Sequence, residues 1–270
     1  MDKLAGYRKN GPSWWIILTV VLLVAIGYQA TAPNKHFSSD CIKIGGGGYS
    51  GFYYMHGILA QHHFVVATGQ RDLLCYSAGC LNAVALWSNY SIDQVIDFGN
   101  EAQQRYLLGQ MPWVGATDRM VHNLIHGHGL AVPATVRASQ QQEGENGVTE
   151  SALQHLIRTN PNFLSSLHII TTTFTAWGWP TMVIRTPETV DELQEMLMQT
   201  SWIPFATGDG WIKNGHLDGG FSILSHPTCP TTICISLDWQ ILFNVVNVLM
   251  PSPMLRELSR KGQQLQLTIL

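Results

Sequence analysis

The stretch Leu73-Leu74-Cys75-Tyr76-Ser77-Ala78-Gly79 places a serine directly between an apolar run and a helix-forming segment. The apolar residues 73–76 predict a buried strand, and residues 78–87, which are rich in alanine and leucine and contain no proline, predict a buried helix. A serine on such a strand-to-helix turn presents its hydroxyl at the edge of a sheet, where the first amides of the helix can stabilise an anion. Ser77 is therefore a candidate nucleophile; the simpler alternative is a serine that caps a buried helix.

Short β-rich segments alternate with helical segments over the rest of the chain. This alternation predicts an α/β fold, a three-layer sandwich with a mostly parallel central sheet. We expect one globular domain at 41–240, preceded by an N-terminal segment at 1–32 and followed by a helical extension at 241–270. The expected strands are 41–44, 64–68, 73–76, 168–174, 182–185 and 232–237, and the expected helices are 52–61, 78–87, 92–108, 117–126, 149–157 and 188–199.

The N-terminal segment 1–32 has the composition of a membrane anchor. Basic residues before position 10 precede the apolar run Trp14–Tyr28, and small residues follow at 30–32, a pattern typical of signal anchors and of cleaved signal peptides. Pro33 would directly follow a cut after Ala32, where proline suits the protease poorly, so we favour an uncleaved anchor. We expect a single-pass membrane protein whose globular domain lies in the lumen or outside the cytoplasm. Secretion after cleavage and a buried core helix are the alternatives.

The composition argues against nucleic acid as a partner. The formal net charge is −3 and 12% of the residues are charged, so the basic surface that phosphate binding requires is missing. The five cysteines form no CxxC pair, so neither a zinc site nor a redox motif is indicated, although one bridge between Cys229 and Cys234 is possible. The sequon Asn89-Tyr90-Ser91 would be accessible to glycosylation if the domain lies in the lumen.

A glycine-rich loop precedes the serine turn. Gly46-Gly47-Gly48-Tyr49-Ser50-Gly51 lies between an expected strand and an expected helix, where unhindered backbone amides can converge on negative charge. One such anion is a dinucleotide pyrophosphate, but the next expected strand ends in Thr68-Gly69-Gln70 rather than in an acidic residue. The other is the oxyanion of an acyl-transfer intermediate, which a serine nucleophile would generate.

A third motif is His216-Leu217-Asp218-Gly219-Gly220, an aspartate in a glycine turn that leaves the carboxylate open to close approach. By itself this is only a turn. The three motifs in this order, together with Ser201-Trp202-Ile203-Pro204, resemble the patatin-like phospholipase family over roughly 42–221.

The resemblance implies a lipid acyl hydrolase that cleaves fatty-acyl esters of phospholipids or glycerides with no cofactor or metal. Ser77 would be the nucleophile and Asp218 the base of a Ser-Asp dyad. The oxyanion hole would be formed by Gly46, Gly47, Gly48 and Ala78, and the motif glycines would be Gly51, Gly79, Gly219 and Gly220. Two positions depart from the pattern: Ser50 stands where a basic residue is common, and Cys75 replaces the first glycine of the serine turn.

Three other functions compete with this prediction. His226 follows Asp218 in the order of an α/β-hydrolase triad. A metal site could form from His122, His126 and His128, although the glutamate of a metalloprotease motif is absent. An inactive lipid-binding or scaffold protein on the same fold would explain Ser50 and Cys75 as signs of decay. The apolar segment 239–250 is expected to be a core helix or one that dips into the bilayer.

Overall fold

The computed structural model describes residues 40–61, 71–110, 115–127, 152–160, 162–203, 207, 210–233 and 251–264. The expected anchor at 1–32, the strand at 64–68 and the helix at 239–250 lie outside these ranges. Within them, no helix is both long enough and apolar enough to cross a bilayer.

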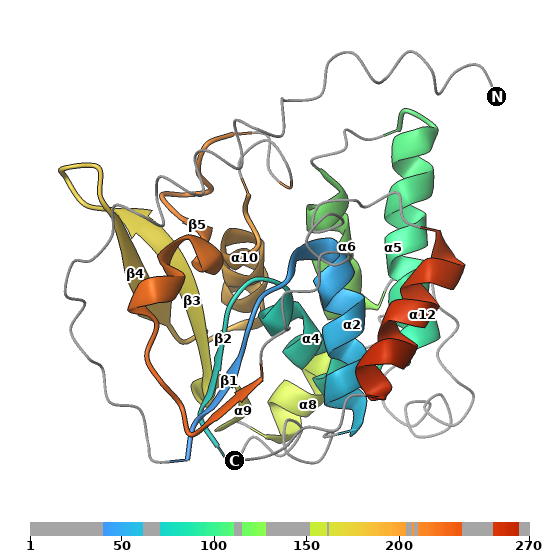
Figure 1. Ribbon diagram of the computed structural model, residues 1–270, viewed down its shortest axis with the longest axis horizontal. Helices are drawn as coiled ribbons and strands as arrows, with labels where there is room; N and C mark the ends of the chain where they lie inside the picture. The colour runs from blue at the N-terminus through green and yellow to red at the C-terminus, as the bar shows by residue number, and fades with distance from the viewer. Residues whose placement is uncertain are drawn as a thin grey trace, which may run out of the picture.

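A central sheet organises the described part of the chain (Figure 1). Its main path runs in the order β4-β3-β2-β1-β6, and β5 pairs separately with β3. The pairs β1–β2, β1–β6 and β2–β3 are parallel, whereas β4 and β5 both pair antiparallel with β3. The mixed α/β prediction with a mostly parallel sheet is therefore confirmed. The strands are β1 (Ile42–Ile44), β2 (Leu73–Cys75), β3 (Leu167–Phe174), β4 (Pro180–Arg185), β5 (Leu217–Asp218) and β6 (Thr231–Ile233).

Six of the described helices agree with predicted segments to within a few residues, whereas α9 and the 3-10 helix η4 were not predicted. α2 begins at Gly48 rather than at Phe52, because the glycine loop turns directly into helix. α5 begins at a capping box in which Ser91 and Gln94 satisfy each other's backbone amides. The helices are α2 (Gly48–Gln61), α4 (Ala78–Trp87), α5 (Ile92–Leu107), α6 (Ala116–His126), α8 (Ala152–Thr159), α9 (Asn162–Ser165), α10 (Val190–Thr200), the 3-10 helix η4 (Gly219–Ser225) and α12 (Ser252–Gln263).

The two faces of the sheet carry unequal cores. Strand residues alternate in direction, so Leu73 and Cys75 of β2 point into the large core shared with the helices, while Leu74 and Tyr76 point the other way. On that second face Leu74, Tyr76 and Ile170 form a small cluster, and η4 packs against β3 and β4. The described helices α2, α4, α5, α6, α10 and α12 contribute to the large core or pack on its members.

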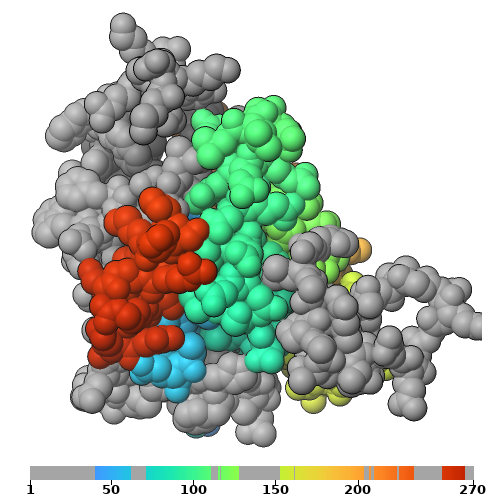
Figure 2. Space-filling model, turned by 90° about the vertical axis from the view of Figure 1, so that its right-hand side faces the viewer, coloured from blue at the N-terminus to red at the C-terminus, as the bar shows by residue number. Residues whose placement is uncertain are grey.

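Helix α12 completes the helical layer by packing on α2 and α5, as the space-filling view shows for its contact with α5 (Figure 2). The expected C-terminal extension is thus helical at 252–263 and contributes Leu255 and Leu258 to the large core. Two glycines allow this close packing. A Cβ on Gly57 would lie 1.9 Å from the carbonyl oxygen of Ser259, and a Cβ on Gly262 would lie 2.1 Å from that of Tyr54.

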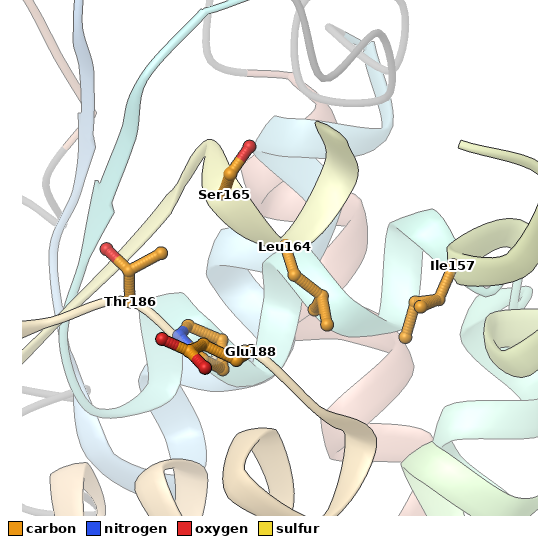
Figure 3. A pocket seen from close by; sticks show the side chains of 6 residues that line it. Ile157, Leu164, Ser165, Thr186 and Glu188 are labelled. Carbon is orange, nitrogen blue, oxygen red and sulfur yellow. The ribbon is translucent and has the colours of Figure 1, made fainter. Parts of the chain in front are cut away.

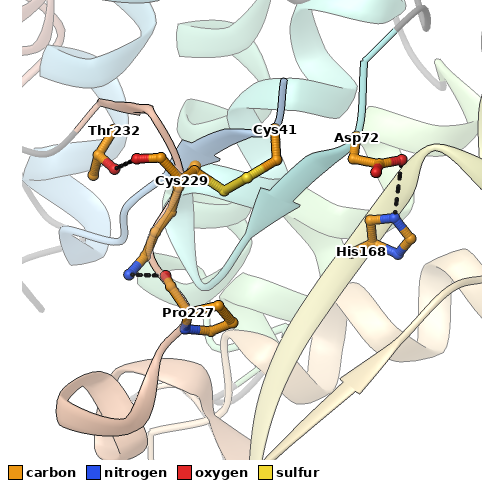
Figure 4. The surroundings of a disulfide bond; sticks show 7 residues. Cys41, Asp72, His168, Pro227, Cys229 and Thr232 are labelled. Carbon is orange, nitrogen blue, oxygen red and sulfur yellow. Dashed lines mark hydrogen bonds and ion pairs between the residues drawn. A yellow bond between two sulfur atoms is a disulfide. The ribbon is translucent and has the colours of Figure 1, made fainter. Parts of the chain in front are cut away.

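Two disulfides join the strands to their surroundings. Cys41 bonds to Cys229, and Cys75 bonds to Cys80 (the first bond is drawn in Figure 4). The suggested pairing of Cys229 with Cys234 is wrong because β1 and β6 are parallel neighbours. With Ile42 opposite Thr231, the cysteines that precede the two strands lie at the same end of the sheet.

The packing of α12 on α2 generates a stability prediction. Replacing a helical glycine by alanine ordinarily stabilises a protein by about 1 kcal/mol, but at Gly57 the new methyl group meets backbone that cannot move aside. We expect Gly57→Ala to lower the free energy of unfolding by roughly 2–3 kcal/mol, measured by denaturant titration. Gly210→Ala is the control, since its Cβ meets no atom closer than 4.0 Å. An unchanged or raised stability of Gly57→Ala would contradict the packing.

Candidate active site

Ser77 occupies a strained turn at the carboxyl end of β2. Its backbone has φ 53° and ψ −136°, a conformation that non-glycine residues seldom adopt, and α4 begins at the next residue. The side chain is 6% exposed. Positive φ at a buried serine between strand and helix is the geometry of a nucleophile elbow, in which backbone strain orients the hydroxyl. Its side chain makes no capping hydrogen bond to α4, so the simpler interpretation as a helix cap is not supported.

Thr200, the last residue of α10, holds this turn in place. Its hydroxyl oxygen accepts a 2.9 Å hydrogen bond from the amide of Ser77 and donates a 2.6 Å hydrogen bond to the carbonyl of Ile170 on β3. Thr200 is fully buried, so no solvent replaces either bond. The threonine therefore connects the elbow to the neighbouring strand. No motif in the sequence pointed to this residue.

Asp218 lies at the end of β5, level with Thr171 of β3. The backbone is fixed on both sides, since its amide donates to the carbonyl of Trp202 (2.9 Å) and its carbonyl accepts from the hydroxyl of Thr172 (2.9 Å). The first of these contacts explains why the segment containing Trp202 accompanies the aspartate. Strands β2 and β3 are parallel, with Cys75 opposite Ile169. Two residues farther along, Ser77 is therefore level with Thr171, which is itself paired with Asp218.

The carboxyl group of Asp218 is buried and asymmetrically bonded. Its Oδ1 accepts a 2.7 Å hydrogen bond from the amide of Gly220, whereas Oδ2 has no described residue in hydrogen-bonding geometry, although the Ser77 side chain is near enough to influence the carboxyl. Burial raises the pKa of this carboxyl from 3.8 to about 6, against the opposing effect of hydrogen bonding from Ser77 and Gly220. Asp218 Oδ2 is thus buried without a hydrogen-bond donor among the described residues, which leaves it able to accept a proton.

The glycine loop lies directly against Ser77. A Cβ on Gly46 would come within 2.9 Å of both the Ser77 Cβ and the ring of Tyr76, so only glycine fits there. Gly48 adopts φ 62° as the loop enters α2, and the Gly51 amide donates back to Gly47 (3.1 Å). The expected oxyanion-hole residues Gly46, Gly47, Gly48 and Ala78 thus lie on the glycine loop beside Ser77 and at the start of α4.

Two of the other motif glycines, Gly79 and Gly219, permit backbone elements to approach each other. A Cβ on Gly79 would lie 2.4 Å from the carbonyl oxygen of Gly45, so the elbow helix packs on the start of the glycine loop. A Cβ on Gly219 would lie 2.5 Å from the carbonyl oxygen of Ile170 and 2.7 Å from Cβ of Tyr76. The three motifs that are separated in the sequence therefore form one site.

Cys75, which stands where the resemblance leads one to expect a glycine, forms a disulfide. Its disulfide to Cys80 joins the last residue of β2 to the first turn of α4 and brackets Ser77. Both cysteines are completely buried in the large core. The side chain of Cys75 points away from Tyr76 and into the core below the elbow.

His226 is close to the site but bonds to backbone. Its Nε2 lies 2.9 Å from the carbonyl oxygen of Gly219, and its ring packs edge-on against Tyr76, with centroids 4.7 Å apart. Burial lowers the pKa of His226 to about 4, with Lys43 adding to the effect. As a neutral imidazole, His226 donates a hydrogen bond from Nε2 to the Gly219 carbonyl and so stabilises the turn that follows Asp218. In this arrangement it does not bond to the Asp218 carboxyl, as a triad would require.

The other candidate ligands do not converge. His122 and His126 of α6 stack with ring centroids 4.5 Å apart, and His126 Nε2 lies 3.0 Å from the amide oxygen of Gln194. Among the described residues, no three His, Cys, Asp or Glu side chains form a metal-binding group, and His128 lies outside the described residues. Asn89 of the sequon is exposed at the end of α4 with φ 56°.

A hollow of about 450 Å³ lies at the other end of the sheet (Figure 3). Its walls come from α8, α9 and the segment after β4, with Leu164 and Glu188 among the lining residues. Leu164 precedes β3, whereas Ser77 follows β2, and these two strands are parallel. The hollow therefore opens at the amino ends of the strands and is separate from the candidate active site.

Comparisons with known proteins do not assign the chain to a family. No family model matches the chain, and no curated protein sequence matches it. Among solved structures, the chain is similar to ExoU in the heterodimeric ExoU–SpcU complex from the type III secretion system of Pseudomonas aeruginosa, with 16% identity, a TM-score of 0.38 and coverage of 83% of this chain and 50% of that chain. For the type III effector protein ExoU alone, the identity is 14% and the TM-score 0.37, with coverage of 84% of this chain and 52% of that chain. The chain spans about half the length of these proteins, and likeness at this level establishes neither family nor activity.

Proposed function

We propose that the chain is a lipid acyl hydrolase that cleaves fatty-acyl esters of phospholipids or glycerides with a Ser77–Asp218 dyad. The observation that carries the proposal is the buried carboxyl of Asp218 beside a serine on a strained elbow, with the glycine loop packed against that serine. A serine hydroxyl needs an adjacent base to become a nucleophile. Among the described side chains, Asp218 is the one whose position and pKa suit that role.

The chemistry follows from the positions of these groups. Asp218 takes the proton of Ser77 as the serine oxygen attacks the ester carbonyl, and the resulting oxyanion is stabilised by amides of the glycine loop and of Ala78. The tetrahedral intermediate collapses to an acyl-enzyme and releases the alcohol, which takes up the proton from Asp218. Water, deprotonated by Asp218, then attacks the acyl-enzyme, and the fatty acid leaves as Ser77 recovers its proton.

The motifs shared with the patatin-like phospholipase family support this proposal. In the sequence they are distant from one another, and in the fold a glycine of the loop and a glycine of the Asp218 turn both lie against residues of the serine motif. The departure at Cys75 is compatible with activity, because a disulfide on the core side of the elbow leaves the side occupied by the glycine loop unchanged. Lipid is proposed as the substrate on this family likeness.

We also propose that the site lies in the lumen of the secretory pathway or outside the cytoplasm, held to a membrane by the segment 1–32. Two disulfides support an oxidising compartment, since cytosolic proteins rarely keep them. The exposed Asn89 of the sequon is consistent with this placement.

Activity of substituted chains tests the dyad. In the full chain, we expect Ser77→Ala and Asp218→Asn to reduce fatty-acid release from mixed phospholipid and triglyceride micelles by at least about 10³-fold. His226→Ala removes a bond to the Gly219 carbonyl and not the base, so we expect a loss of less than about 10-fold.

The outcomes separate the alternatives. A loss in His226→Ala as large as in Asp218→Asn, with the fold intact by circular dichroism, would replace the dyad by a triad. If the folded wild-type chain releases no fatty acid and a fluorophosphonate does not label Ser77, the hydrolase proposal is wrong.

The raised pKa of Asp218 predicts two opposite pH effects. A base must be ionised, so the rate of ester hydrolysis should fall as the pH drops through about 6. For stability, a carboxyl whose folded pKa exceeds its unfolded value favours the fold at low pH, and this contribution is lost as the pH rises through about 6. Asp218→Asn should therefore unfold at a higher denaturant concentration than wild type at pH 8, and this difference should disappear near pH 4. If the stability of Asp218→Asn relative to wild type is lower at pH 8 than at pH 4, the pKa of the Asp218 carboxyl is not raised by burial.

Thr200 provides a test of elbow positioning. Thr200→Val keeps the shape but leaves the Ser77 amide and the Ile170 carbonyl without their partner. We expect a loss of about 1–3 kcal/mol in unfolding free energy and a fall in kcat of roughly 10-fold with KM changed little, because the elbow is positioned less well. Thr200→Ser, which keeps the hydroxyl, should restore kcat. A Val variant with wild-type kcat would show that Thr200 is only a core residue.

A further inference from the structure

The exposed phenylalanine and tryptophan side chains of the described ranges lie on two neighbouring segments. Three are on the β3–β4 hairpin: Phe174 is 44% exposed, Trp177 88% and Trp179 56%. The fourth, Trp211, is 68% exposed and is followed by Ile212 at 46%, just before β5. Large exposed apolar side chains that gather in this way usually mark a binding surface.

The hairpin extends from the carboxyl end of β3, the end of the sheet at which the candidate active site lies. β3 runs parallel to β2, and Asp218 pairs with Thr171, so Phe174 at the end of β3 lies beyond the level of the dyad. At about 3.3 Å per residue the separation is roughly 10 Å, and the tip with Trp177 is farther out. In Figure 1 the β3–β4 loop and the segment leading into β5 both lie toward the same end as the start of α2, which contains the glycine loop.

The tip is ordered by its own hydrogen bonds. The amide of Thr175 donates to the carbonyl of Trp179 (2.8 Å), and the Thr175 hydroxyl accepts from the Trp179 amide (3.1 Å). Gly178 adopts φ 78°, which closes the turn. The two tryptophans are therefore presented to solvent on a fixed loop and do not fold back on the sheet.

The chemistry of the tip fits a lipid surface. Residues 174–182 contain no charged side chain, and tryptophan is the residue that best suits the boundary between headgroups and acyl chains, because its ring is apolar and its N–H is polar. Lys213, the charged residue of the second segment, places its ammonium 5.1 Å from the centroid of the Trp202 ring.

We propose that the β3–β4 hairpin and the Trp211–Ile212 segment dock on the surface of a phospholipid bilayer. Trp177 and Trp179 enter the headgroup region, and the end of the sheet at which Ser77 and Asp218 lie faces the bilayer. The proposal rests on the proposed function for its purpose, which is to deliver a lipid ester to the dyad, but docking itself requires no hydrolysis.

Docking is measured on the full chain carrying Ser77→Ala, incorporated into phosphatidylcholine vesicles. One preparation carries an environment-sensitive fluorescent amino acid at position 177, and its matched control carries the same probe at position 254. Met254 is 42% exposed on α12, on the opposite side of the molecule from the hairpin (Figure 1). Because both chains contain the segment 1–32, the comparison reports which face touches lipid and not whether the protein is attached.

We expect the emission at position 177 to shift to the blue and to be quenched at least about 2-fold by lipids brominated on their acyl chains, with position 254 unchanged. Because the tip is uncharged, the quenching should change little between about 50 mM and about 500 mM salt. Equal quenching at both positions, or none at position 177, would overturn the proposal.

Hydrolysis separates docking from catalysis. In the chain that keeps the wild-type Ser77, the double variant Trp177→Ala, Trp179→Ala should reduce hydrolysis of vesicle lipid by about 10-fold and leave hydrolysis of a short soluble ester unchanged. The control variant Met254→Ala should change neither rate. An equal loss on both substrates would mean that the tip acts through the fold and would overturn the proposal. A chain that shows the quenching pattern but hydrolyses neither ester would support docking and contradict the proposed function.

Discussion

The left-handed backbone of Ser77 is the constraint on which the site depends. A buried serine holds φ 53° only if its surroundings fix it, because the conformation costs on the order of 1–3 kcal/mol. Three neighbours do so. Thr200 accepts from its amide, the glycine loop packs against its Cβ, and the Cys75–Cys80 disulfide ties the strand before it to the helix after it. The strained turn and the glycines beside it therefore depend on one another.

Burial of Asp218 follows from the same arrangement. The antiparallel pairing of β5 with β3 sets the aspartate level with the elbow, and the glycines after it let the backbone lie against Ile170 and Tyr76. A carboxyl in this position loses hydration and holds its proton more tightly, which raises its pKa toward neutral pH. The small second core, to which Tyr76 and Ile170 belong, is thus part of what raises the pKa of this carboxyl.

Local patterns in the sequence were sufficient for most of the described elements and for naming Ser77 and Asp218 as candidates. Both residues could be singled out because each lies in a short motif with glycines, and the fold brings these motifs together. Thr200 could not, since a threonine at the end of a helix has no distinctive pattern and its partners, Ser77 and Ile170, are distant in the chain. The pairing of Cys41 with Cys229 depends on the parallel register of β1 and β6, which composition does not reveal. The expected anchor at 1–32 lies outside the described residues and stays a prediction.

Activation of Ser77 by Asp218 is measured by the rate at which a fluorophosphonate modifies Ser77, with the modified residue identified by mass spectrometry. We expect modification at Ser77 in the folded chain, a rate at least about 100-fold lower in Asp218→Asn, and little change in His226→Ala. Modification that is absent from Ser77, or that proceeds at the wild-type rate in Asp218→Asn, would contradict activation by Asp218.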